Sequence, residues 1–271
     1  MVFTEAQAAQ FREWGYLAVP DFWTAREAAA MQAETERLKQ GGLLRNVATE
    51  GDGATPTRVK ANLQICPVSP HSEFFRAMPF APKVAEAVSQ LIGDPVLLHL
   101  DQIFLKPARH GVGTNWHQDN AYFQIPDPLT GVALWTAVHG ATAANGAMRV
   151  IPGSFRVQYE HSRDPDSDHH VRCYPPEEEA VLVELPAGGA LFFAYGVAHA
   201  TGANTTDQER AGMALHFLTE SAAGTAHGME GGAHPYLSGP KATGGLREYG
   251  VRVAGTWEEQ VATPPSPAPT G

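Results

Sequence analysis

The stretch GALFFAYGVAHATGANTTDQERAGMALHFLTE, residues 189–220, decides the fold class predicted for this chain. It contains two short apolar segments, 189–202 and 210–220, which include aromatic residues and are bounded by glycine or polar residues. Such segments are typical of buried β-strands, and the polar residues between them are typical of a turn. The stretch therefore predicts two strands joined by a hairpin, with the second strand beside the first.

Further segments of the same kind occur upstream of this stretch. Each is short, apolar or alternating, and glycine, proline or asparagine separates it from the next; they are 96–107, 115–125, 131–141, 147–153 and 180–186. A series of this kind predicts an all-β sandwich or barrel of about eight strands.

The first third of the chain has a different period. Apolar residues recur at helical spacing in three segments, which are 4–15, 24–39 and 81–92. Thr4 is a plausible N-cap of the first helix, and Gly93 is a plausible end of the third. We therefore expect a mainly β chain with flanking α-helices at its N-terminal end.

These elements predict one domain over residues 1–262. Its N-terminal helices lie in 1–95 and its β core in 96–220. The segment TPPSPAPTG, residues 263–271, is rich in proline and is expected to be a disordered tail. Residues 155–179 are polar and acidic, and a loop of this length is often functional, so it is either a lid over a site or a solvated surface loop.

Composition excludes several classes of function. The 271 residues carry a net charge of −10, which makes nucleic acid a poor candidate partner. Only two cysteines are present, which fits a reducing compartment better than a disulfide framework. No signal pattern and no apolar run of membrane-spanning length occur, so we expect a cytoplasmic protein with no membrane partner.

His117 and Asp119 are separated by one residue in a strand-like segment, so their side chains are expected to share one face. His199, which lies between two alanines, is the best third ligand. Two histidines and one carboxylate that leave open coordination positions are typical of iron(II) oxygenases. The His-x-Asp pattern is weak evidence by itself, and a buried histidine hydrogen-bonded to a neighbouring aspartate is the alternative.

Arg210 strengthens the interpretation as an iron site. It follows His199 by eleven residues, and the predicted hairpin can place it on the strand beside His199. Arginine binds a carboxylate through two charge-assisted hydrogen bonds, as the distal carboxylate of an iron-chelating keto acid requires. Thr201 can add a hydroxyl donor to the same carboxylate. A surface charge after a polar turn is the alternative for Arg210.

Four segments together resemble the phytanoyl-CoA dioxygenase family of non-haem iron(II)/2-oxoglutarate oxygenases. They are FREWGYLAVPDFW (11–23), WHQD (116–119), NGAMRVIPGSF (145–155) and LPAGGALFFAYGVAHATGANTTDQERAGMALHF (185–217). The resemblance implies a double-stranded β-helix, the jelly roll of cupin-like proteins, with helices outside it. This fold agrees with the predicted series of strands.

The resemblance also implies roles for single residues. His117, Asp119 and His199 match the iron ligands, and Arg210 matches the salt-bridge partner of the 2-oxoglutarate C5 carboxylate. Three further residues match co-substrate positions: Thr201 as a helper of Arg210, Trp135 in the pocket wall and Gln102 as a hydrogen-bond donor. Lys60 aligns less clearly with another such position. Core packing is the alternative for Trp135.

The activity that the resemblance implies is a dioxygenase reaction with O₂ and 2-oxoglutarate as co-substrates. The expected outcome is hydroxylation of a C–H bond in a small-molecule metabolite, with natural-product biosynthesis as a candidate setting and with release of succinate and CO₂. Desaturation, cyclisation and epimerisation remain open, as do the substrate and the oligomeric state. Two other readings remain: a cupin-type metalloenzyme that needs no 2-oxoglutarate, and a non-catalytic ligand-binding relative.

Overall fold

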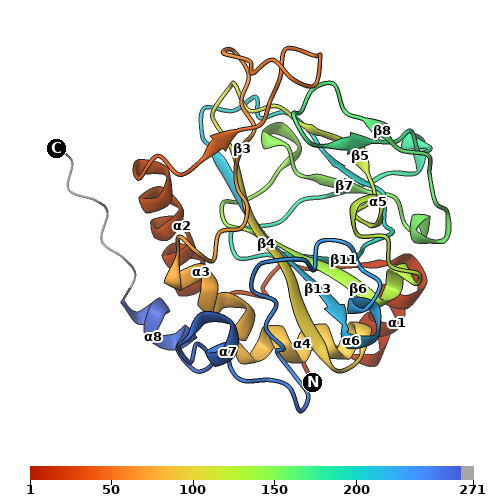
Figure 1. Ribbon diagram of the computed structural model, residues 1–271. Coiled ribbons are helices and arrows are strands. Elements are labelled where there is room, and N and C mark those ends of the chain that lie inside the picture. The colour runs from red at the N-terminus through yellow and green to blue at the C-terminus, as the bar shows by residue number, and fades with distance from the viewer. Residues whose placement is uncertain (264–271) are drawn as a thin grey trace.

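Two β-sheets lie face to face in the computed structural model, which describes residues 1–263, and helices cover the outside of the larger sheet (Figure 1). The larger sheet has the order β1-β11-β6-β13-β4-β3-β2. Its strands are β1 (Tyr16–Val19), β2 (Arg45–Asn46), β3 (Leu63–Ile65), β4 (Val96–Lys106), β6 (Gly131–Ala137), β11 (Ala190–Ala194) and β13 (Arg210–Thr219).

The smaller sheet has the order β10-β7-β12-β5, and its neighbouring strands are antiparallel. Its strands are β5 (Thr114–His117), β7 (Met148–Val150), β10 (Val181–Val183) and β12 (His199–Thr201). A separate hairpin of β8 (Ser162–Arg163) and β9 (Val171–Arg172) lies within the long polar loop. The predicted mainly β core with flanking helices is confirmed.

The three predicted helices are present as α1 (Glu5–Trp14), α2 (Ala25–Gln40) and α4 (Pro82–Ile92). Thr4 and Thr24 each form a capping box, in which the side chains at the two ends of the first turn satisfy unpaired backbone N–H groups. Gly93 ends α4. The buried side of α4 packs on the outer face of the larger sheet, over β4, β6 and β13.

Five shorter helices were not predicted: α3 (Glu73–Ala77), α5 (Asn120–Phe123), α6 (Glu220–Ala223), α7 (Leu246–Tyr249) and α8 (Trp257–Ala262). Single 3₁₀ turns also occur, as η1 (Met78–Phe80), η2 (Pro128–Thr130), η3 (Ala143–Asn145), η4 (Ser154–Arg156) and η5 (Glu177–Glu179). Helices this short do not show a readable period and depend on tertiary packing for their stability.

Two predicted strands need correction. The segment 115–125 is a strand only as far as His117, after which the chain turns into α5. The segment 189–202 is two strands rather than one, because the chain leaves the larger sheet after Ala194 and enters the smaller sheet at His199. As a result β12 and β13 belong to different sheets, and the predicted hairpin between them is wrong.

The predicted tail, 263–271, lies outside the described residues except for Thr263. The description of 1–262 as one domain stays a prediction. Within residues 1–263, none of the helices combines the length and the apolar character needed to cross a lipid bilayer.

Candidate active site

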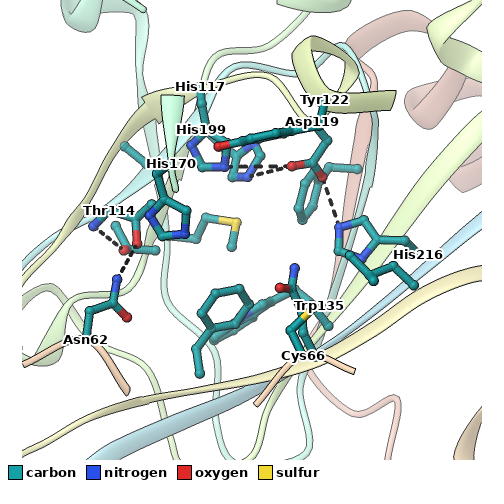
Figure 2. A pocket seen from close by; sticks show the side chains of 18 of the residues that line it. Asn62, Cys66, Thr114, His117, Asp119, Tyr122, Trp135, His170, His199 and His216 are labelled. Carbon is teal, nitrogen blue, oxygen red and sulfur yellow. Dashed lines mark hydrogen bonds and ion pairs between the residues drawn. The ribbon is translucent and has the colours of Figure 1, made fainter. Parts of the chain in front are cut away.

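A cavity of about 220 Å³ lies between the two sheets and is lined by residues of both (Figure 2). The smaller sheet contributes His117 from β5 and His199 from β12. The larger sheet contributes Arg210 from β13 and Trp135 from β6, among others. Residues that are predicted to act together therefore meet across the space between the sheets.

His117, Asp119 and His199 form a group whose potential ligand atoms all lie within 4.8 Å of one another. The two histidines are direct register partners on neighbouring antiparallel strands. Each imidazole Nε2 is 3.7 Å from Oδ1 of Asp119. Figure 2 shows the three side chains pointing to one corner of the cavity, so the predicted convergence is present.

Asp119 reaches this corner for a different reason from the one expected. It is not on the strand with His117, because its backbone is helical and it precedes the first residue of α5. The turn from β5 into α5 brings the carboxylate back toward the imidazole. Asp119 therefore joins His117 through a helical turn and not, as predicted, through alternation along one strand.

Backbone hydrogen bonds fix which nitrogen of each imidazole faces the cavity. Nδ1 of His117 donates to the Asn115 carbonyl at 2.8 Å, and Nδ1 of His199 donates to the Val197 carbonyl at 3.0 Å. A carbonyl only accepts, so in a neutral ring Nε2 keeps its lone pair for a metal ion. Burial lowers the pKa of His117 to about 3, and this ring is therefore neutral near pH 7.

His216 holds the carboxylate of Asp119 from the opposite sheet. Its Nε2 donates to Oδ2 of Asp119 at 3.2 Å, and its Nδ1 has no hydrogen-bond partner within residues 1–263. Burial by itself raises the pKa of Asp119, but the neighbouring His199, His216 and His117 outweigh that effect and hold the pKa below its usual value. The carboxylate is therefore charged near pH 7, as a metal ligand must be.

Hydrogen bonds from Gln118 and from the turn at 151–154 support the backbone next to the metal ligands. The Gln118 amide donates to the carbonyls of Gly196 and Val157 at 2.6 and 2.8 Å. The Ser154 hydroxyl accepts from the backbone N–H of Ala198 at 2.8 Å. This turn therefore fixes the backbone directly before His199.

Arg210 begins β13 on the larger sheet and is 1% exposed. Its guanidinium lies over the Trp135 ring, 5.2 Å from the centroid, and donates to the Gly146 carbonyl. Its Nε has no partner among residues 1–263. Burial lowers the pKa of Arg210 to about 10, so it stays charged near pH 7. The prediction that Arg210 lies on the strand beside His199 is wrong. Arg210 is on the larger sheet and faces His199 from across the cavity.

Thr201 and Lys106 meet at the same end of the cavity as Arg210. The Thr201 hydroxyl oxygen accepts from the Thr114 backbone N–H at 3.1 Å and from the Lys106 ammonium at 2.8 Å. A hydroxyl has two acceptor positions and one donor, so the donor remains for another group. The sequence prediction identified Thr201 but missed Lys106 and also His216.

Gln102 and Trp135 both line the cavity, and their contacts with a co-substrate stay predictions. Lys60 does not line it, because its side chain is exposed and its backbone carbonyl accepts from Asn46 instead. Asn62, two residues later, lies in the cavity wall. The weak alignment of Lys60 with a co-substrate position is therefore wrong.

Part of the long polar loop reaches the cavity. His170 lines it, and the backbone N–H of Val171 donates to the Tyr122 hydroxyl at 2.8 Å. Tyr122 and Phe123 of α5 also line the cavity, whereas both polar atoms of the Asn120 side chain bond to the backbone of Ile125. That this loop acts as a lid over the site stays a prediction.

The donor set fits a divalent iron ion. Two imidazoles and one charged carboxylate approach from one side, and this combination suits iron(II) with positions left for other ligands. The opposite wall carries a buried guanidinium whose Nε has no partner among the described residues, which fits an anion. The cavity thus has a metal-binding corner and an anion-binding wall.

Comparison with known proteins agrees with this geometry. The family profile described as "Phytanoyl-CoA dioxygenase (PhyH)" matches residues 11–212. A probable phytanoyl-CoA dioxygenase of Caenorhabditis elegans is 28% identical over 153 residues, which are 51% of this chain and 49% of that protein. The ectoine dioxygenase of Sphingopyxis alaskensis is 24% identical over 77% of this chain and 74% of its own length.

Solved structures show the same fold. The epimerase SnoN, in complex with Fe³⁺, alpha ketoglutarate and nogalamycin RO, superposes with a TM-score of 0.67 at 24% identity, covering 79% of this chain and 83% of SnoN. EctD from S. alaskensis, with 2-oxoglutarate and 5-hydroxyectoine, gives a TM-score of 0.63 at 23% identity, covering 82% and 78%. The jelly-roll core is therefore confirmed. Because the family profile spans most of the chain, this protein belongs to the phytanoyl-CoA dioxygenase family.

Proposed function

We propose that this protein is an iron(II)/2-oxoglutarate-dependent dioxygenase that hydroxylates a C–H bond of a small-molecule metabolite. The observation that carries the proposal is the pairing, across one cavity, of the His117–Asp119–His199 group with the buried Arg210. Membership of a dioxygenase family supports the reaction class. In the balanced reaction, the substrate C–H, 2-oxoglutarate and O₂ give the C–OH product, succinate and CO₂.

In this proposal His117, Asp119 and His199 hold the iron, which when bound supplies activation of O₂. Both histidines are oriented by backbone carbonyls, and Asp119 is oriented by His216. Such support keeps the ligands in place without help from the metal. The protein's contribution is therefore a fixed set of three donors on one side of the ion.

Arg210, Thr201, Trp135 and Gln102 bind 2-oxoglutarate in the proposal. Arg210 donates to the distal carboxylate, Thr201 adds its free hydroxyl proton and Trp135 stacks under the guanidinium. Gln102 lies on the same face of the sheet and offers an amide donor. Together these groups orient the co-substrate and exclude water from its distal end.

The primary substrate meets a wall formed by Tyr122, Phe123 and His170. Among the described lining residues, the three with formal charges are Asp119, Lys106 and Arg210. All three belong to the metal and co-substrate ends, so we propose an uncharged reactive portion of the substrate. SnoN is described as an epimerase and SnoK as a carbocyclase, both from nogalamycin biosynthesis, so these outcomes stand beside hydroxylation.

We further propose a cytoplasmic, single-domain enzyme. Cys66 and Cys173 are both free thiols, as in proteins of reducing compartments. The net charge of −10 argues against a nucleic-acid partner.

The decisive experiment measures the weak visible charge-transfer absorption of an iron(II)–2-oxoglutarate chelate under anaerobic conditions. Wild type and His71→Ala, which replaces an exposed histidine, should both show the band. His199→Ala should lose it, and the wild type should release succinate from 2-oxoglutarate once oxygen is admitted. A folded, iron-loaded wild type without the band would overturn the co-substrate assignment and favour a cupin-type or non-catalytic protein.

A further inference from the structure

Tyr195 is a buried phenol that the proposed reaction does not use. It follows the last residue of β11, where the chain leaves the larger sheet, and it is 0% exposed. It does not line the cavity of the active site. A Cβ at Gly131 would lie 2.5 Å from Cδ2 of the Tyr195 ring, so this glycine provides the room that the ring occupies. The ring is thus held in place and shielded from molecules in the cavity.

The hydroxyl of Tyr195 is hydrogen-bonded to the ring of His99, and the tautomer of that ring can be assigned. Nε2 of His99 is 2.8 Å from the His227 carbonyl, which only accepts, so Nε2 carries a hydrogen. Burial is the main cause that lowers the pKa of His99 to about 4, so the ring is neutral near pH 7 and Nδ1 keeps its lone pair. Tyr195 therefore donates to Nδ1, and the two atoms are 3.1 Å apart.

In the resting protein the proton stays on the phenol. Burial, and then the nearby Asp119, raise the pKa of Tyr195 well above its ordinary value of 10.0. Transfer of the proton alone to His99 would create two buried charges, which is unfavourable. Loss of an electron changes this balance, because an oxidised phenol is a strong acid and a base within hydrogen-bond reach can take its proton in the same step. The pair can therefore lose an electron from Tyr195 without leaving a charge on the phenol ring.

Two short connections link Tyr195 to the metal ligand Asp119. The ring centroids of Tyr195 and His216 are 5.9 Å apart, and Nε2 of His216 donates to the Asp119 carboxylate at 3.2 Å. The Tyr195 carbonyl accepts from the backbone N–H of Asn120, the residue after Asp119, at 2.8 Å. An electron thus has a path of one intervening residue between Tyr195 and a ligand of the metal.

We infer that Tyr195 gives one electron to the iron centre when O₂ and 2-oxoglutarate react there without a primary substrate, and that its phenol proton passes to Nδ1 of His99. The inference rests on the proposed function, because that reaction supplies the oxidant. The O–H bond of Tyr195 breaks and an N–H bond forms on His99, which becomes an imidazolium. Tyr195 is oxidised to a neutral phenoxyl radical, and the oxidised iron centre is reduced by one electron. The step removes an oxidising equivalent that would otherwise reach oxidisable side chains of the cavity wall, such as Met148 and Cys66.

The surroundings of His99 can accept the positive charge that this step creates. Its Nε2–H is bonded to the His227 carbonyl, and the negative charge of Asp119 favours the imidazolium form. His99 also lines a second cavity, of about 320 Å³. These contacts lower the cost of forming a cation on a buried ring.

The test is rapid freeze-quench electron paramagnetic resonance. Anaerobic protein with Fe(II) and 2-oxoglutarate is mixed with O₂ in the absence of a primary substrate. Wild type should give a tyrosyl radical signal, and its hyperfine pattern should collapse when the tyrosines are ring-deuterated. Tyr195→Phe should lose the signal, and His99→Leu, which removes the base, should slow its formation roughly 100-fold or more. Tyr174→Phe, at a position that is 75% exposed, is the matched control and should give the wild-type signal.

Two further measurements apply if the variants of the pair do not fold. The radical of wild type prepared in D₂O should show an exchangeable deuteron coupled to the phenoxyl oxygen, which is the one that His99 has received. Tyr122→Phe, which changes a tyrosine of the cavity wall, should keep the signal.

Four results would overturn the inference. They are a wild type that releases succinate without forming the radical, a radical without the exchangeable deuteron, a wild-type signal in folded Tyr195→Phe or at the wild-type rate in folded His99→Leu, and loss of the signal in a Tyr122→Phe that still releases succinate. A wild type that shows neither the charge-transfer band nor succinate release would instead overturn the proposed function.

Discussion

At the scale of single residues, the direction of the Asp119 carboxylate depends on His216. The imidazole is 3% exposed and donates to the carboxylate oxygen Oδ2, while Oδ1 is the atom near both histidines. The hydrogen bond thus assigns one oxygen to the protein and leaves the other for the metal. His216 is a positioning residue, because it acts on the site through Asp119.

We predict that His216→Leu lowers the affinity for Fe(II) or Mn(II) by about 10- to 100-fold, the usual effect of removing a hydrogen bond to a metal ligand. Competition with a chelator under anaerobic conditions measures this affinity. His99→Leu is the control, because His99 is equally buried but bonds to Tyr195 and to the His227 carbonyl instead. Equal metal affinities in the two variants would show that Asp119 keeps its orientation without His216.

At the scale of elements, one face of β4 and β13 builds most of the anion-binding wall. Alternate residues of β13, from Arg210 to His216, lie opposite alternate residues of β4, from Lys106 to Leu100. Because side chains of a strand alternate between faces, a single register places all of them toward the cavity. The set of side chains that line the cavity therefore follows from the position of Arg210 and from the pairing of β4 with β13.

The chain turns from β7 into η4, and Ser154, the first residue of η4, bonds to the backbone of Ala198 directly before β12. Ser154→Ala removes the acceptor of the buried Ala198 N–H. Leaving such a group unsatisfied costs about 1–3 kcal/mol, which urea unfolding would measure. The affinity for metal should also fall, because the backbone before His199 loses its anchor. Ser162→Ala, at an exposed position in β8, should leave both quantities unchanged. A wild-type stability in Ser154→Ala would contradict this account of the turn.

The sequence predicted the elements with a clear period and the residues within a motif. The strands β4, β6 and β13 and the helices α1, α2 and α4 were identified because their apolar residues repeat over many positions. The break after Ala194 was missed, because the residues on both sides of it are equally apolar. Lys106 and His216 were missed because their function depends on strand pairing, which a single sequence does not reveal. The alternation along β13 already placed His216 on the face of Arg210, and this was the signal that could have identified it.

At the scale of the whole molecule, Glu27 joins three helices on the side of the larger sheet away from the cavity. Its carboxylate accepts from Lys83 of α4 at 2.6 Å and from the Trp257 indole of α8 at 2.8 Å, and it also caps its own helix through Thr24. Glu27 is 8% exposed. The helices packed in this way support the outer face of the sheet whose inner face carries Arg210, so the network serves stability and does not touch the site.

The network makes part of the stability depend on pH. Burial alone would raise the pKa of Glu27, but its hydrogen bonds with Lys83, Trp257 and Thr24 outweigh burial and hold the pKa below its ordinary value of 4.5. A carboxyl with a lowered pKa in the folded state stabilises that state above its unfolded pKa, and the contribution is lost as the pH falls further.

Wild type should therefore be more stable than Glu27→Gln at pH 7, and the difference should shrink below about pH 4.5. Urea unfolding at a series of pH values measures both quantities, with the exposed Glu178→Gln as the control. A difference that stayed constant down to pH 3 would mean that Glu27 contributes through packing and not through its charge. In either case the affinity for 2-oxoglutarate at pH 7 should match wild type, because Glu27 does not line the cavity.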